Sequence, residues 1–241
     1  MRIGKYEFRP KVLPTLATIV LLPVLVLLGF WQLSRTEEKR AILIEQEQQA
    51  AMPPYELTGS ADILDDIAYR YLLVSGKYQP QYTIYIDNKV HQGKVGYQIV
   101  VPLLIKGTQT AVLINRGWIA GAQTREVLPV VQTPEYEVMV KGLAKVETKD
   151  IVSFGSQNRL GNDWPALVRW VDIARLQSTL PFEIKPFVLL QESEAADGLI
   201  RQWHFVNSPP EKNLSYAVQW FALAATLLLI FFWVNMKKVS E

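Results

Sequence analysis

KNLSYAVQWFALAATLLLIFFWV, residues 212–234, is the stretch that decides the fold of this chain. From Ala217 onward it carries no charge, and Gln219 and Thr226 are its only polar side chains. About 18 such residues suit a helix that crosses the hydrocarbon core of a bilayer. The sequence therefore predicts a transmembrane helix, which we place at residues 214–235.

The first turns of this helix differ from the rest of it. Tyr216 is followed by Gln219 three residues later and by Trp220 four residues later, so a helix presents all three on one face. They stand at the depth where amphipathic aromatic side chains meet lipid headgroups. This face is therefore either a membrane anchor or a functional site.

A second apolar run lies near the other end of the chain. Residues 12–31 are uncharged throughout, and about 20 such residues are enough for one crossing. The run is longer than the apolar core of an ordinary signal peptide, and it closes with LGFWQL at 28–33 in place of a small-x-small cleavage site. We therefore predict an uncleaved transmembrane helix over residues 12–33.

Charges beside the two helices predict their orientation. The tail at 1–11 is basic, and Lys237 and Lys238 follow the second helix. By the positive-inside rule, the tails at 1–11 and 236–241 both face the cytoplasm. Residues 34–213 then lie on the outer side of the membrane, and they are numerous enough to bury a core of their own.

The domain at 34–213 begins as a helix and continues as strands. Residues 35–51 are rich in Glu, Gln, Lys and Ala and lack Gly and Pro, so we expect the first helix to continue outward through them. Within this domain, a further helix is expected at 171–179. The predicted fold class is α+β, with two transmembrane helices flanking an antiparallel β-barrel or β-sandwich that carries a few helices. Strands are predicted from β-branched and aromatic runs at 69–78, 82–87, 95–105, 109–119, 136–146, 151–154, 186–191 and 200–206.

Composition excludes several classes of function. The chain has 25 Lys and Arg against 23 Asp and Glu, and this balance gives no basic stripe for nucleic acid. It has no cysteine, which excludes disulfides, zinc-finger clusters and a C-x-x-C redox pair. Its two histidines, His91 and His204, have no neighbour that would complete a metal site or a nucleophile-base pair. We therefore predict that the chain has neither a catalytic site nor a resident metal. The expected partner is a lipid membrane.

Asn115-Arg116-Gly117-Trp118 is the most unusual stretch of the predicted outer domain. Gly and Asn at a strand end are ordinary turn chemistry, and Trp118 can simply be buried against the sheet. The functional alternative is that Arg116 holds a carboxylate of a partner in bidentate fashion while Trp118 supplies a flat face. Asn115, Arg116 and Trp118 are therefore candidate partner-binding residues.

The outer ends of the two predicted helices mirror each other. Trp31 and Gln32 close the first helix, as Tyr216, Gln219 and Trp220 open the second. An aromatic belt at the membrane surface explains the aromatic residues but does not explain an amide in each cluster. We expect the two clusters to form the walls of one groove.

Four motifs carry a resemblance to a known family. They are LGFWQLSR at 28–35, with Lys39 following, GKY at 76–78, NRGW at 115–118 and LSYAVQWF at 214–221. In that order they resemble the Surfeit-locus (Shy-one type) cytochrome oxidase assembly family over nearly the whole chain. The resemblance implies a membrane protein that assists maturation of haem-copper oxidase subunit I and, in some bacteria, binds haem a. The short N-terminal tail indicates a bacterial member in the inner membrane, with residues 34–213 in the periplasm.

One departure from the family pattern concerns haem. The family typically carries a histidine ahead of the Leu-x-Tyr that opens the second helix, and Asn213 stands in its place. Imidazole is a usual protein ligand of haem iron, whereas an amide is a poor substitute. Either His204 replaces that ligand, or the iron lacks it, or no haem is bound. The cofactor-binding candidates implied by the resemblance are Tyr216, Trp220, Trp31 and His204.

Two functional hypotheses follow from the sequence. The first is a non-enzymatic assembly factor that assists the insertion of haem a, held transiently, into subunit I of a cytochrome c oxidase. The second is a cofactor-free membrane scaffold that docks and stabilises an oxidase subunit through residues 115–118 and the helices. Both name subunit I and other oxidase assembly factors as partners, and neither involves nucleic acid.

Overall fold

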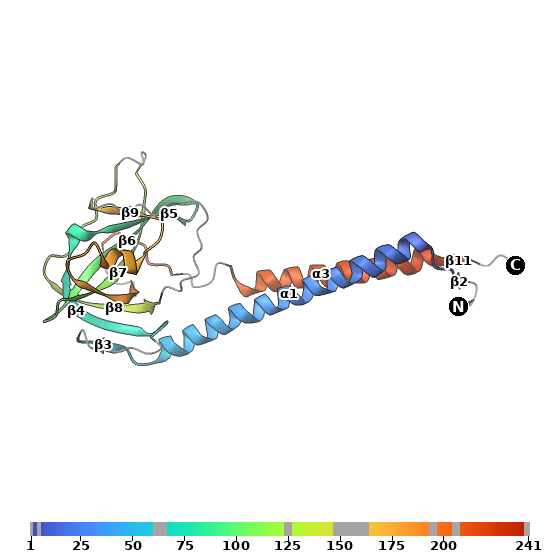
Figure 1. Cartoon of the computed structure of the whole chain (residues 1–241), viewed down its shortest axis with the longest axis horizontal. Helices are drawn as coiled ribbons and strands as arrows, with labels where there is room; N and C mark the ends of the chain where they lie inside the picture. Colours follow the sequence, from blue (N-terminus) through green and yellow to red (C-terminus); the bar gives the residue numbers. More distant parts are fainter. Residues whose placement is uncertain are drawn as a thin grey trace. The chain divides into compact units, whose positions relative to one another are not determined.

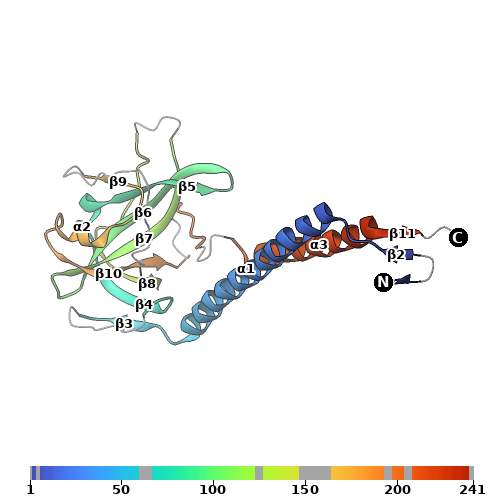
Figure 2. The same ribbon diagram turned by 45° about the vertical axis from the view of Figure 1, so that its right-hand side comes forward.

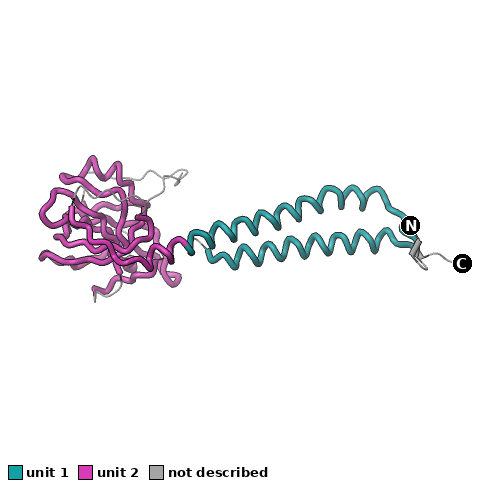
Figure 3. Tube along the Cα trace, turned by 90° about the horizontal axis from the view of Figure 1, so that it is seen from below, with its two compact units in different colours: residues 1–44, 204–241 teal, residues 45–203 magenta. Residues whose placement is uncertain are grey.

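A computed structural model describes residues 2–3, 6–59, 67–122, 127–146, 164–192, 197–203 and 208–238. The chain divides into two compact units (Figure 3). Unit 1 comprises Met1–Ile44 and His204–Glu241, and unit 2 comprises Glu45–Trp203.

Unit 1 is built on two long helices. The helix α1 spans Val12–Ala51, and α3 spans Pro210–Asn235. Both are long and apolar enough to cross a membrane, and both views of the ribbon show them side by side (Figures 1 and 2). The expected continuation of the first helix through residues 35–51 is confirmed, because α1 has no break before Ala51.

Small residues bring the two helices together. Gly29 of α1 is buried, and a Cβ atom there would lie only 2.6 Å from the ring of Phe221 on α3. The rings of Phe30 and Phe221 meet edge to face at 5.4 Å. On α3 itself, Ala217 and Ala224 are buried. Small residues that let helix backbones approach closely are typical of helix packing in membranes.

The other end of the helix pair is closed by a small sheet and an asparagine. The strands β1 (Arg2–Ile3), β2 (Tyr6–Phe8) and β11 (Met236–Lys238) form a three-stranded sheet with β2 in the centre. The side-chain oxygen of Asn235 accepts a hydrogen bond at 2.7 Å from the backbone N–H of Lys11, just ahead of α1. The side chain of one helix thus satisfies a backbone donor at the start of the other.

Unit 2 is a mixed β-sheet domain. In its described part, eight strands pair in the order β3-β4-β8-β10-β7-β6-β5-β9, and a further pairing of β4 with β6 closes a circuit through β4, β8, β10, β7 and β6. The short helices η1 and α2 accompany these strands. The bounds are β3 (Tyr55–Leu57), β4 (Tyr71–Tyr78), η1 (Pro80–Tyr82), β5 (Ile84–His91), β6 (Lys94–Ile105), β7 (Thr110–Ala120), β8 (Glu137–Lys145), β9 (Ala166–Val168), α2 (Ile173–Gln177) and β10 (Glu183–Gln191).

Most of the predicted elements of unit 2 are present, but the purely antiparallel sheet was wrong. The pairs β10 with β7, β3 with β4, and β5 with β9 are parallel. A parallel pair needs a long crossover, and the chain between β7 and β10 supplies one that contains β8, β9 and α2. The three-residue strands β3 and β9 were not predicted. The predicted strand at 151–154 lies outside the described residues.

The core of unit 2 lies within the closed circuit of strands. In β4 the buried residues alternate with partly exposed ones, as expected for a strand with one face on a core. The strand β7 differs, because residues 110–118 are all buried. A strand buried on both faces leaves little room for a charged side chain, and β7 nevertheless carries Arg116. The core cluster includes Leu72, Val74, Ile99, Val101, Leu103, Val112, Ile114, Phe187 and Leu189.

Candidate functional site

An irregularity in β7 sets the position of Arg116. Val100 of β6 pairs with Asn115, but the next residue back, Ile99, pairs with Gly117, so Arg116 has no partner on β6. This arrangement is a β-bulge, in which one extra residue re-aims the side chains that follow it. Beyond the bulge, Ile119 lines the same cavity as Arg116. The alternation of side chains between the two faces of β7 is therefore shifted by one residue between Arg116 and Ile119.

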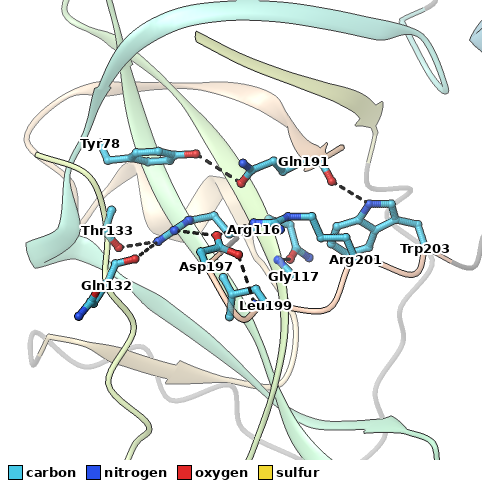
Figure 4. Close-up of polar contacts among 11 residues, drawn as sticks. Tyr78, Arg116, Gly117, Gln132, Thr133, Gln191, Asp197, Leu199, Arg201 and Trp203 are labelled. Carbon is cyan, nitrogen blue, oxygen red and sulfur yellow. Dashed lines mark hydrogen bonds and ion pairs between the residues drawn. The ribbon is translucent and has the colours of Figure 1, made fainter. Parts of the chain in front are cut away.

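The guanidinium group of Arg116 is held from several sides. One terminal nitrogen donates to the carbonyl of Gln132 at 3.1 Å and to the hydroxyl of Thr133 at 2.6 Å. The other donates to Asp197 at 3.0 Å (Figure 4). The group also lies 5.3 Å from the centre of the Tyr78 ring, and Arg116 is only 2% exposed. Burial raises the pKa of Tyr78 to about 12, so its hydroxyl stays protonated at neutral pH.

Asp197 forms ion pairs with two arginines, Arg116 and Arg201. One of its oxygens accepts hydrogen bonds from both Arg116 and Arg201, and the other accepts one from the backbone N–H of Leu199 at 3.2 Å. Burial by itself would raise the pKa of Asp197. The hydrogen bond from Arg201, the bond from Leu199 and the charges of both arginines outweigh burial, so the pKa is lowered.

We expect the stability of unit 2 to depend on Asp197 in acid. A carboxylate whose pKa is lowered by folding contributes stability above its unfolded pKa of about 3.9, and that contribution is lost as the pH falls through the folded value. Urea unfolding of the full chain in detergent should show the free energy of unfolding decreasing below about pH 4. In Asp197→Asn the decrease should be smaller, by about 1–3 kcal/mol. An identical pH profile in both proteins would contradict this role.

Because Gly117 has no side chain, the segment that carries Asp197 and Arg201 can lie close to β7. Its φ of +132° is a backbone conformation that other residues rarely adopt, and a Cβ atom there would lie 2.9 Å from the carbonyl oxygen of Ile200. Next to it, Trp118 and Ile200 exchange backbone hydrogen bonds at 2.7 and 2.8 Å. The glycine therefore lets residues 197–201 approach β7 closely enough for Asp197 to reach Arg116.

A cavity of about 740 Å³ adjoins this cluster. Its polar lining includes Arg116, Asp197, Thr133 and Gln191. Most of the remaining lining is apolar and comes from the segment 130–140, from Ile119 and from Leu199. The arrangement is a cavity that combines apolar side chains with a few polar groups and the charges of Arg116 and Asp197, a combination found in ligand pockets.

The structure does not bring Trp118 to this cavity. Its indole N–H donates to the carbonyl of Lys89 at 2.8 Å, and its ring lies 5.1 Å from that of His91. Asn115 turns back on its own strand, where its side-chain oxygen accepts from the N–H of Gly117 at 3.2 Å. Of the three candidate partner-binding residues, Arg116 alone lines the cavity.

In unit 1, four polar residues form a cluster at one end of the helix pair. The side-chain N–H of Asn213 donates to the carbonyl oxygen of the Gln32 side chain at 2.7 Å. Its own carbonyl oxygen accepts from the ammonium group of Lys39 at 2.6 Å, and Lys39 also donates to the Ser208 hydroxyl at 2.7 Å. We call Gln32, Lys39, Ser208 and Asn213 the helix-end cluster. The side-chain amide of Gln32, which an aromatic belt does not account for, has its partner here.

The aromatic candidates of unit 1 lie at the surface of that unit. Trp31 is 54% exposed and Tyr216 is 42% exposed, while Trp220 is partly buried. The guanidinium group of Arg35 lies 5.9 Å from the ring of Trp31. His204 lies outside the described residues. Cofactor binding by Trp31, Tyr216 and Trp220 therefore stays a prediction, and their exposure leaves them accessible to lipid or to a ligand.

The family model for the SURF1 family matches residues 19–225. This chain belongs to the SURF1 family. The match includes most of both long helices and all of unit 2, and it confirms the resemblance drawn from the four sequence motifs. Because the model extends over the greater part of the chain, Arg116 and the helix-end cluster both lie within the region that defines a SURF1 family member.

Named relatives agree with this assignment. A SURF1-like protein of Rickettsia felis is 25% identical over 90% of this chain and 94% of its own length. One from Rickettsia bellii is 26% identical over 90% of this chain and 88% of its own length. The cytochrome oxidase assembly protein SHY1 of Saccharomyces cerevisiae is 28% identical over 39% of this chain and 24% of its own length.

Proposed function

We propose that this SURF1 family member assists the assembly of a haem-copper cytochrome oxidase by supporting the maturation of subunit I. The observation that carries the proposal is the family match over residues 19–225, in a family that includes a yeast protein named for oxidase assembly. The two apolar helices support action at a membrane. In this proposal the membrane is the bacterial inner membrane, both termini are cytoplasmic, and unit 2 works in the periplasm beside other assembly factors.

We propose that the protein acts by binding and not by catalysis. Within the described residues, no group of three or more His, Asp or Glu side chains is placed to hold a metal ion. The buried Arg116 and the partly buried Asp197 and Arg201 form ion pairs among themselves, as in a structural or binding site. Members of this family serve as assembly factors, which fits a role based on contacts.

Haem a as a transient ligand belongs to this proposal, with one restriction at Asn213. Both polar atoms of the Asn213 amide are already engaged, by Gln32 and by Lys39. An amide is in any case a poor ligand for haem iron, so the residues around Asn213 do not fit axial ligation. This misfit favours the second candidate function, a cofactor-free scaffold that holds an oxidase subunit at the membrane.

Two measurements test the proposal and separate its two forms. Deleting the gene should lower oxidase activity in membranes, and restoring the wild-type chain should recover it; unchanged activity would overturn the assembly role. An absorption spectrum of the protein, purified from cells that make haem a, then decides on the cofactor. A Soret band supports haem handling, whereas colourless protein that still restores the oxidase supports the scaffold.

Asn213→His should increase the haem bound to the purified protein. Imidazole restores the ligand type that Asn213 lacks. The change also removes the hydrogen bonds that the Asn213 side chain makes with Gln32 and Lys39. The height of the Soret band relative to protein absorbance measures the effect, with Ser215→His, one helical half-turn away and exposed, as the matched control. Equal bands in Asn213→His and the wild-type chain would place Asn213 outside any haem site.

A further inference from the structure

The cavity of unit 2 is bordered by an edge of β8. Val138, Met139 and Val140 all line it. Successive side chains of a strand point to opposite faces of its sheet, so three consecutive residues cannot line one cavity through one face. They can do so where the edge of the strand, with its backbone groups, borders the cavity.

Among the residues that the structure describes, no strand lies beside this edge of β8. On one side, β8 pairs with β4 from Glu137 to Leu143. On the other side, it pairs with β10 only over residues 142–145, and the last backbone bond there runs from the N–H of Glu192 to the carbonyl of Lys141. In the described chain no backbone hydrogen bond reaches the second edge at 138–140. Such an edge is a template for an added strand.

Arg116 also lines the cavity, and it is a cation with one donor that has no partner among the described residues. Within the described residues, Nε of Arg116 is buried and has no hydrogen-bond partner. The single carboxylate of Asp197 is divided between two guanidinium groups. The pKa of Asp197 is lowered, despite partial burial, by the hydrogen bonds from Arg201 and Leu199 and by the charges of both arginines. Arg116 therefore has the charge and the planar donor geometry that suit a second carboxylate.

Apolar side chains surround the opening of the cavity. Val130 is 91% exposed, Tyr136 is 71% exposed and Met139 is 67% exposed. All three line the cavity, next to the free edge of β8. Exposed apolar residues that gather around a hollow are typical of a site that a partner covers. The volume of about 740 Å³ is within the usual range of ligand pockets.

We propose that this cavity binds the C-terminal end of an extended peptide, which adds as a strand to residues 138–140 of β8 and directs its terminal carboxylate to Arg116. The free backbone edge favours a peptide, because only a peptide backbone can continue the ladder. A chain terminus is favoured because it ends in a carboxylate, the group that suits the guanidinium of Arg116 in the cavity lining. The site concerns unit 2 alone and does not depend on the oxidase assembly role.

A peptide pool tests this proposal directly. The purified full chain in detergent is incubated with hexapeptides randomised among Val, Ile, Leu and Thr, made with either a free C-terminal carboxylate or a C-terminal amide. We expect enrichment of carboxylate peptides, and the amide form of an enriched sequence should bind at least tenfold more weakly. N-methylation at alternate peptide nitrogens should weaken binding similarly, because it removes the strand hydrogen bonds. Absence of enrichment, or equal affinities of the acid and amide forms, would overturn the proposal.

Substitutions at exposed positions provide the matched controls. Met139→Glu places a negative charge at the opening and should weaken binding of the carboxylate peptides at least tenfold. Leu167→Glu, on the exposed surface of β9, should leave that binding unchanged. Equal effects of the two variants would place the peptide elsewhere. Decanoic acid that binds as tightly as the enriched peptides would replace the peptide by a small amphiphilic acid and overturn the proposed occupant.

Discussion

Arg116→Ala should lower the free energy of unfolding of unit 2 by about 3 kcal/mol, since removing one member of a buried ion pair leaves its partner insufficiently compensated. Asp197 would keep its bond to Arg201 but lose the one to Arg116 at 3.0 Å. The Thr133 hydroxyl and the carbonyl of Gln132 would lose their donor. Alanine would also remove the group that lies against the ring of Tyr78.

Urea unfolding and hydrogen exchange of β7, both on the full chain in detergent, measure this effect. Lys106→Ala is the matched control, because Lys106 forms an ion pair with Glu137 in which both side chains are more than half exposed. Its loss should cost less than about 1 kcal/mol. The double variant Arg116→Ala/Asp197→Ala should be less destabilised than the sum of its single changes. Additive effects, or a cost for Arg116→Ala no larger than for Lys106→Ala, would refute a structural role for this ion pair.

Local patterns in the sequence were sufficient for most of the elements. Continuous apolar runs predicted both long helices, and β-branched runs predicted β4 to β8 and β10, because each of these signals is contained within one segment. The parallel pairing of β10 with β7 could not be predicted in that way. It depends on where a connection of some 60 residues returns the chain, and no local period encodes that path.

The candidate sites show the same division between local and distant information. The motif at 115–118 identified Arg116, since a charged residue just after an apolar run is visible in the sequence. Its partner Asp197 is 81 residues away, and the helix-end bond between Gln32 and Asn213 joins residues 181 apart. Spacing rules relate only residues on one element, so neither pair had a sequence signal. The phase shift that separates Trp118 from Arg116 arises from a bulge, which equally follows from pairing with β6.

Gly117→Ala should destabilise unit 2 by about 2–4 kcal/mol, because two costs combine at one position. A φ of +132° is unfavourable for alanine, and the new methyl group would lie 2.9 Å from the carbonyl oxygen of Ile200. That oxygen belongs to the backbone and accepts from the N–H of Trp118, so it can retreat only by breaking the bond. The displaced segment at 197–201 would carry Asp197 away from Arg116.

Gly107→Ala separates the two costs. Gly107 also has a positive φ, of +74°, but a Cβ atom there would meet nothing within 4 Å. Its replacement should therefore cost only the backbone term of about 1 kcal/mol. Urea unfolding of both variants gives the comparison, and hydrogen exchange at 197–203 reports whether that segment loosens in Gly117→Ala alone. Equal destabilisation by the two substitutions, with unchanged exchange at 197–203, would show that the close approach to Ile200 does not hold Asp197 in place.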